Sequence, residues 1–120
     1  MSFEYDNQNI FAKILRGEIP NRTVFESEHA LAFEDINPAA PVHILVIPKG
    51  PYLSMDHFCL EASADEIEGF MRAVGEVSKI ADVDGGFRVI SNTREHGMQE
   101  VPHLHFHILG GRTLGPLLAG

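Results

Sequence analysis

The 120-residue sequence lacks the features that would direct a chain to an oxidising or membrane environment. Its one cysteine, Cys59, cannot form an intrachain disulfide, which suits a reducing compartment. The first ten residues contain no basic segment followed by an apolar one, and no uncharged apolar run approaches the roughly 20 residues that cross a bilayer. A cytoplasmic location is therefore expected. Cys59 lies between Phe58 and Leu60, which predicts a small buried side chain rather than a nucleophile.

An excess of basic residues is also missing. The formal net charge is −8, which disfavours long-range attraction for DNA or RNA phosphates and leaves room only for a small local anion site. The apolar fraction of 44% and the charged fraction of 22% are close to globular averages, so composition does not indicate disorder. This length suits one domain that buries a core without disulfides or metals. We therefore expect a single domain over residues 1–120 that has neither nucleic acid nor membrane as a partner.

Apolar periodicity predicts two helices and five strands. The first helix, residues 10–16, places Ile10, Phe11, Ile14 and Leu15 on one side and is ended by Gly17. The second, residues 63–81, begins with a Ser63–Glu66 capping box and lines one face with Ile67, Phe70, Met71, Val74 and Val77. The predicted strands span residues 23–27, 30–34, 43–47, 87–91 and 103–109. Few strand–helix–strand alternations occur, which indicates an antiparallel α+β fold.

The last predicted strand carries three histidines at every second position, His103, His105 and His107. Successive side chains of a strand point to opposite faces, so these imidazoles should share one face while Leu104, Phe106 and Ile108 pack on the other. Three of the seven histidines of the chain fall in this pattern. The segment is therefore the strongest candidate for a functional site.

Three interpretations of these histidines remain open. They could be polar residues on a solvated sheet face, although such a face seldom places histidines so regularly. They could bind a metal, since neutral imidazole ligates zinc, but rings spread over roughly 13 Å of strand cannot all reach one ion. Adjacent pairs could chelate with a third ligand from elsewhere. The interpretation that fits best is nucleophilic and general acid catalysis at phosphorus, which needs no metal.

The motif resembles the His-φ-His-φ-His-φ-φ signature, where φ is apolar, of the histidine-triad (HIT) superfamily. Other segments look like its Hint branch in the same order: residues 10–14, 31–36, 40–49 and 109–112, with a short tail similar to that of bacterial Hint proteins. The resemblance implies a HIT-like fold with a five-stranded antiparallel sheet and two helices. It also implies a homodimer in which two sheets join into ten strands, with no cofactor and no metal.

The same resemblance implies an enzyme that hydrolyses purine nucleoside 5′-phosphoramidates. Adenosine phosphoramidate and aminoacyl or lysyl adenylates would be cleaved through a nucleotidyl-histidine intermediate to a nucleoside monophosphate and an amine. The alternatives are a dinucleoside polyphosphate hydrolase or a nucleotidyl transferase of the same superfamily, or a nucleotide-binding module without catalysis.

Roles carried over from the resemblance fall on named positions of this chain. His105 would be the nucleophile, His103 would orient it through its main-chain carbonyl, and His107 would contact the phosphate and assist the leaving group. His43 would support these groups, and Asp35 would accept hydrogen bonds from the ribose hydroxyls. The apolar slot for the base would comprise Ile10, Phe11, Ile14, Phe33 and Ile36. The phosphate or ribose would be bound by Asn92 and Gln99, with main-chain N–H groups near Glu100 and Val101.

Three residues of the loop before the last strand depart from the family pattern or add to it. Glu100 stands where a small hydroxyl residue is usual, so its carboxylate would repel a phosphate unless it points away or binds the leaving-group amine. Met98 stands where glycine is common, so a positive φ there would carry a steric cost. His96 is an additional histidine, expected to face solvent.

Overall fold

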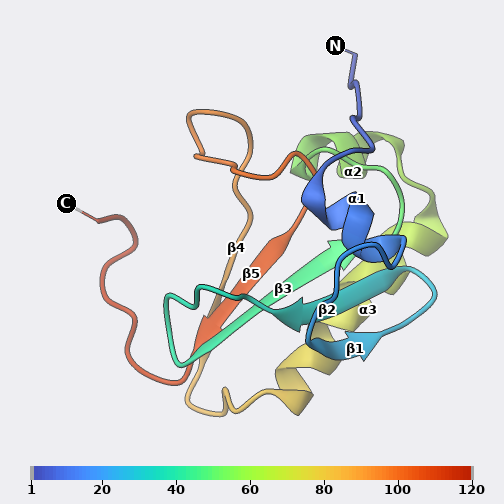
Figure 1. The fold of residues 1–120 in the computed structure, drawn as a ribbon. Coiled ribbons are helices and arrows are strands. Elements are labelled where there is room, and N and C mark those ends of the chain that lie inside the picture. The colour runs from blue at the N-terminus through green and yellow to red at the C-terminus, as the bar shows by residue number, and fades with distance from the viewer. Residues whose placement is uncertain (1, 120) are drawn as a thin grey trace.

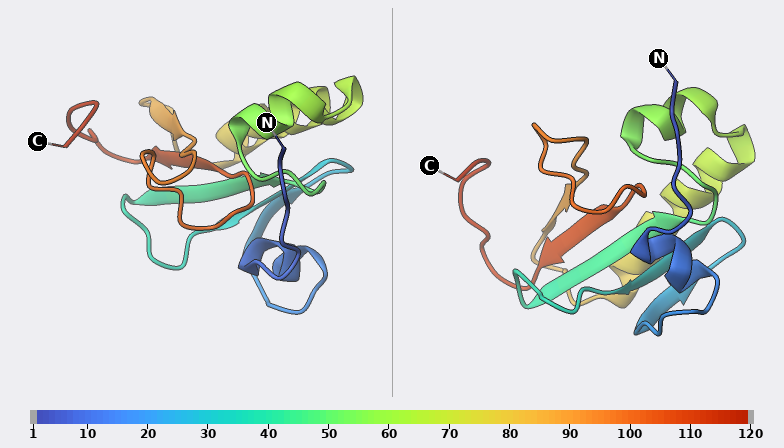
Figure 2. Two further views of the ribbon diagram at one scale, coloured as in Figure 1. Left: turned by 90° about the horizontal axis from the view of Figure 1, so that it is seen from above. Right: turned by 45° about the horizontal axis from the view of Figure 1, so that its top comes forward.

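The computed structural model describes residues 2–119 and contains a five-stranded antiparallel sheet with helices on both faces (Figure 1). The strand order is β1-β2-β3-β5-β4. The strands are β1 Thr23–Glu26, β2 Ala30–Glu34, β3 Val42–Pro48, β4 Phe87–Ile90 and β5 Phe106–Gly110. The helices are α1 Ile10–Leu15, α2 Met55–Glu61 and α3 Ala64–Ile80. The predicted α+β fold with an antiparallel sheet is confirmed. The left panel of Figure 2 shows α2 and α3 on one side of the sheet and α1 on the other.

Helix α3 covers one face of the sheet and builds the larger core. The predicted capping box at its start is formed in both directions between Ser63 and Glu66. Phe70 and Val77 are fully buried, and the Phe70 ring meets the Phe106 ring edge-on at 4.9 Å. Leu104, Phe106 and Ile108 belong to this core, as their alternation with the histidines predicted. Met71 was expected on the same face but is half exposed.

Helix α1 covers the opposite face with a smaller apolar cluster. Its buried side chains are Phe11 and Ile14, which pack against inward-facing residues of two central strands. The strand residues of this cluster are Leu31, Phe33, Leu45 and Ile47. The helix begins at Asn9, whose side chain accepts a hydrogen bond from Ala12 N–H. Where α1 packs on the sheet, both sheet faces are therefore buried. The triad lies in this part of the sheet.

The structure differs from the sequence-based prediction in two elements. Helix α2, residues Met55–Glu61, was not predicted, and it places Cys59 in solvent rather than in the core. Strand β5 begins at Phe106, three residues later than expected. The reason is local: Pro48 of the neighbouring strand has no N–H to donate, and the carbonyl of His103 is taken by the His105 ring. Two of the three histidines therefore precede the strand.

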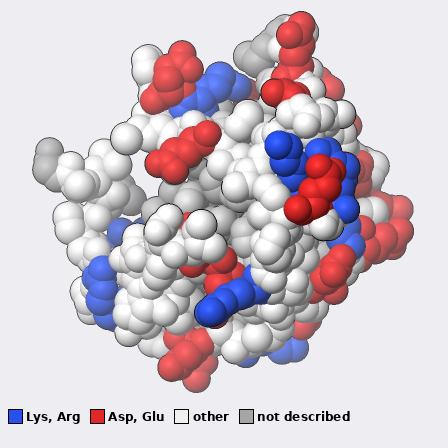
Figure 3. All heavy atoms as spheres, in the orientation of Figure 1, with Lys and Arg blue, Asp and Glu red and all other residues white. Residues whose placement is uncertain are grey.

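The surface bears no single basic patch on the face that Figure 3 shows, where Lys and Arg side chains alternate with Asp and Glu. None of the helices in residues 2–119 combines the length and the apolar character that a bilayer crossing requires.

Candidate functional site

The triad histidines lie together on the α1 side of the sheet. The His105 ring is 5.0 Å from the His107 ring and 5.0 Å from the Phe11 ring, while His103 lies 6.3 Å from Phe11. Access to solvent differs among them: His103 is fully buried, His105 is 5% exposed, and His107 is partly buried. The shared face expected from the alternation is present, although His103 is sealed within the protein.

A main-chain carbonyl fixes the tautomer of His105. Its Nδ1 lies 2.7 Å from the carbonyl oxygen of His103. A carbonyl can only accept, so Nδ1 carries the hydrogen and donates it. In the neutral ring Nε2 therefore keeps its lone pair, and that lone pair is what a nucleophile needs.

His103 is held by hydrogen bonds at both ring nitrogens. Its Nε2–H donates to the carbonyl oxygen of Pro48 over 2.9 Å, so Nδ1 is the acceptor for the hydroxyl of Tyr5, at 2.5 Å. Tyr5 is 98 residues away in the chain, and no pattern in the sequence marked it as part of the site.

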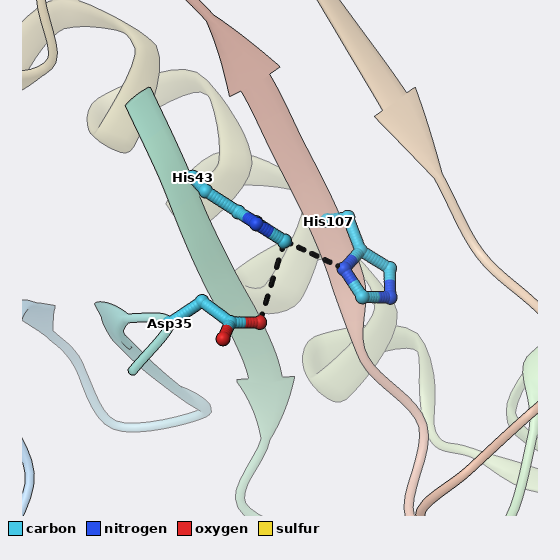
Figure 4. A group of neighbouring side chains, drawn as sticks. All are labelled: Asp35, His43 and His107. Carbon is cyan, nitrogen blue, oxygen red and sulfur yellow. Dashed lines mark hydrogen bonds and ion pairs between the residues drawn. The ribbon is translucent and has the colours of Figure 1, made fainter. Parts of the chain in front are cut away.

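His43 and His107 form a second hydrogen-bonded group with Asp35 (Figure 4). In the antiparallel pairing of β3 and β5, His43 lies opposite Leu109, so His107 is its diagonal neighbour on the same face. Ala39 N–H donates to His43 Nδ1 at 3.0 Å, which places the hydrogen of the neutral ring on Nε2. That Nε2 is 2.9 Å from His107 Nδ1 and 3.4 Å from a carboxylate oxygen of Asp35.

This group determines which atom of His107 can donate. Because His107 Nδ1 accepts from His43, the neutral His107 ring carries its hydrogen on Nε2. Asp35 is held in turn by Asn37 N–H, which donates to Oδ1 over 2.8 Å. A carboxylate has about four lone-pair directions, so Asp35 keeps acceptor capacity for other donors.

Burial keeps all four imidazoles neutral near pH 7. It lowers the pKa of His103 to about 4 and that of His107 to about 4, and the proximity of His105 and His43 further disfavours a proton on His107. It also lowers the pKa of His105 and that of His43. The nucleophile therefore needs no deprotonation before it can attack. An anionic phosphate placed before His107 would favour its charged form.

The donor atoms of Asp35, His43 and His107 lie within 4.8 Å of one another, so these residues could hold a metal ion. Two imidazole nitrogens and one carboxylate oxygen are donors that zinc accepts. The same atoms form the hydrogen-bonded group described above.

The residues expected to bind the base divide into a buried wall and an exposed rim. Phe11, Ile14 and Phe33 belong to the α1 core and are at most 9% exposed, whereas Ile10 is 44% and Ile36 is 89% exposed. An open groove of about 810 Å³ is lined by Asp35, Ile36 and His43 at one side and by the end of α3 at the other, and its lining includes neither the triad histidines nor the buried wall. The two exposed isoleucines are free to contact a ligand.

The loop of residues 92–102 is tied to the segment around α2. Arg94 donates to both carboxylate oxygens of Asp56, at 3.3 and 2.7 Å. Gln99 Nε2 donates to the carbonyls of Leu53 and Val101 at 2.7 and 2.9 Å, and its Oε1 accepts from Arg94 N–H. Both amide hydrogens of Gln99 are thus used inside the protein. The Gln99 side chain therefore braces the loop, and binding of phosphate or ribose by Gln99 stays a prediction.

The other loop residues divide between packing and solvent. Asn92 and Val101 are partly buried, and Val101 packs against the α1 core. Glu100 is exposed, and its negative charge raises the pKa of His105 against the larger effect of burial. His96 is exposed, as expected. Met98 adopts a φ of +59°, so the left-handed conformation is present despite its side chain.

Comparison with known proteins gives consistent matches over nearly the whole chain. The HIT domain model matches residues 16–114. An uncharacterized HIT-like protein of Azospirillum brasilense is 57% identical over 98% of both chains. The purine nucleoside phosphoramidase of Escherichia coli K12 is 43% identical over 93% of this chain and 94% of its own. The structure of a histidine triad protein from Clostridium difficile superposes with a TM-score of 0.82 at 39% identity, covering 96% of this chain and all of that one.

Proposed function

The chain belongs to the HIT family, and we propose that it hydrolyses purine nucleoside 5′-phosphoramidates such as adenosine phosphoramidate or aminoacyl and lysyl adenylates. The observation that carries the proposal is the hydrogen bond from His105 Nδ1 to the His103 carbonyl, which directs an unprotonated Nε2 away from that anchor. The 43% identity to a purine nucleoside phosphoramidase supports the choice of substrate.

In the first step, His105 Nε2 attacks the α-phosphorus. A phosphorus–nitrogen bond to the imidazole forms as the bond to the leaving amine breaks, and the electron pair departs with the amine. The anionic phosphate favours uptake of a proton from solvent by His107. The resulting imidazolium donates its Nε2–H to the departing nitrogen and returns to the neutral ring.

In the second step, water attacks the phosphorus of the nucleotidyl-histidine. The bond to His105 breaks, and the ring leaves in its neutral form with its hydrogen still on Nδ1. The neutral His107 accepts the proton that the attacking water gives up. The products are a nucleoside monophosphate and the amine. Asp35 would hold the ribose hydroxyls with its remaining lone pairs, and the base would rest between the Phe11–Phe33 wall and Ile36.

The test is a comparison of wild type with His105→Ala and with the matched control His96→Ala. His105→Ala should lower kcat on adenosine phosphoramidate by on the order of 10⁴-fold while AMP binding, measured by calorimetry, survives. His96 is exposed, so its substitution should change neither quantity. Rapid quenching followed by mass spectrometry should find adenylate on His105. Full activity of His105→Ala would refute the proposal.

Substrate and chelator controls separate the rival functions. Turnover of diadenosine polyphosphate faster than that of the phosphoramidate would favour the polyphosphate hydrolase. AMP binding without turnover of either substrate would favour a binding module. Unchanged activity in excess chelator is expected, because no step above uses the Asp35–His43–His107 group to hold a metal.

We further propose that the protein forms a homodimer through β4. This strand is an edge of the sheet, and Phe87 and Val89 are 45% and 42% exposed along it. An edge strand with apolar side chains presents free main-chain groups to a second copy. The opposite edge, β1, ends in Glu26, which pairs with Lys49.

A further inference from the structure

The segment before α1 passes over the end of the sheet at which the triad begins (Figure 1). Phe3 stacks on the ring of His57 in α2, with centroids 4.4 Å apart and planes 8° from parallel. Two residues later, the Tyr5 ring meets the His103 ring edge-on at 5.6 Å. This segment therefore connects α2 to the first histidine of the triad.

The Tyr5 hydroxyl pairs the ring nitrogen of His103 that the Pro48 carbonyl leaves unprotonated. Its O–H donates to His103 Nδ1, and this requires a lone pair on that atom and the ring hydrogen on Nε2, where Pro48 accepts it. His103 has no exposed surface, so water cannot replace the hydroxyl without a rearrangement. Removal of the hydroxyl would leave a buried acceptor unpaired.

The residue held in this way is the one that orients His105. The carbonyl of His103 accepts the His105 Nδ1–H bond, so a shift of His103 moves the acceptor that aims Nε2. We propose that Tyr5 is a positioning residue for the His105 nucleophile, acting through the ring and carbonyl of His103. This inference rests on the proposed function. Tyr5 bonds to His103 rather than to a group proposed to react or to bind substrate.

The effect expected from Tyr5→Phe is specific. A neutral hydrogen bond of this kind contributes about 0.5–1.5 kcal/mol, so kcat on adenosine phosphoramidate should fall by roughly 3- to 10-fold if the bond supports the reactive geometry. KM should change by less than about 2-fold, because ground-state contacts with the nucleotide remain.

The chain provides a matched control in Tyr52→Phe. In the wild type, the Tyr52 hydroxyl donates to Glu66 at the start of α3. This variant therefore also removes one tyrosine hydroxyl, but from a contact at a helix terminus. Both variants would be compared with wild type by thermal unfolding, by steady-state kinetics, and by ¹⁵N NMR of the imidazole nitrogens. The ¹⁵N shift of His103 Nδ1 reports whether that unprotonated nitrogen accepts a hydrogen bond.

Support would be a lower kcat and a His103 Nδ1 that no longer accepts a hydrogen bond in Tyr5→Phe alone, with wild-type kinetics in Tyr52→Phe. An active wild type with an unchanged kcat in Tyr5→Phe would overturn the positioning role and leave the proposed function intact. Equal losses of kcat in both variants, in proportion to lost stability, would also overturn it. A wild type that turns over no phosphoramidate would refute the proposed function itself.

Discussion

Acid should destabilise the protein through its buried histidines, and His103 gives the clearest case. Its folded pKa is about 4, whereas an unfolded histidine titrates near 6.5. The unfolded chain therefore binds more protons over this interval. Because the folded protein resists protonation of this histidine, folding becomes less favourable as the pH falls. Stability is full above the unfolded pKa of about 6.5 and decreases as the pH falls from there toward the folded pKa of about 4.

The magnitude follows from the two pKa values. At pH 7 both states are largely deprotonated, and at pH 5 the unfolded histidine is almost fully protonated while the folded one is not. Integration of the difference gives a loss of about 2 kcal/mol from His103 between pH 7 and pH 5. His107 has a similarly low pKa but is partly exposed, so it should add less. A loss of this size is a large part of a typical stability of about 5–15 kcal/mol.

The measurement is urea unfolding of wild type and His103→Gln at pH 7 and pH 5. This window lies above the range in which most carboxylates titrate, so histidines dominate it. The variant has no titrating group at this position, so its loss between the two pH values should be smaller by about 2 kcal/mol. His96→Gln, altered at an exposed loop position, should behave as wild type. Equal pH dependence of wild type and His103→Gln would refute the reasoning.

Two further predictions concern the site loop and the sheet edge. Met98→Gly should raise stability by about 0.5–1 kcal/mol in thermal unfolding, because Met98 has a φ of +59° and is 77% exposed. Arg94→Gly, at a φ of +53°, should instead lower stability because Arg94 pairs with Asp56. A Met98→Gly variant less stable than Arg94→Gly would contradict the assignment of strain to Met98. Val89→Lys should convert the expected dimer into monomers in analytical ultracentrifugation, since charge on an edge strand opposes pairing. A dimer that persists would exclude β4 as the interface.

Elements with a strong local pattern could be predicted from the sequence. Helix α3 was found because its capping box and apolar stripe are local signals, and the Ser63–Glu66 bonds are formed as expected. The common face of the triad followed from strand alternation alone. Helix α2 was missed because a seven-residue helix with few buried residues has almost no periodicity.

The hydrogen bonds that hold the site residues in place could not be predicted in the same way. The Tyr5–His103 bond joins residues 98 positions apart and depends on the path of an irregular segment. Gln99 was assigned to the ligand from the family resemblance, and nothing in the sequence indicated that its amide would also donate to the main-chain carbonyls of Leu53 and Val101. Sequence shows which residue types are available, whereas the packing of the loop decides which donors are already used.

Main-chain groups fix the tautomers on which the proposed chemistry depends. The His103 carbonyl sets His105, the Ala39 N–H sets His43, and through His43 it sets His107. Substitutions other than to proline leave these groups in place, so the direction in which each ring donates depends on the backbone segments that lead into β3 and β5. A chain could keep all three histidines and still lose the site if that backbone moved. The motif supplies the imidazoles, and the strand pairing that makes His107 the diagonal neighbour of His43 supplies the hydrogen-bond directions that the proposed chemistry needs.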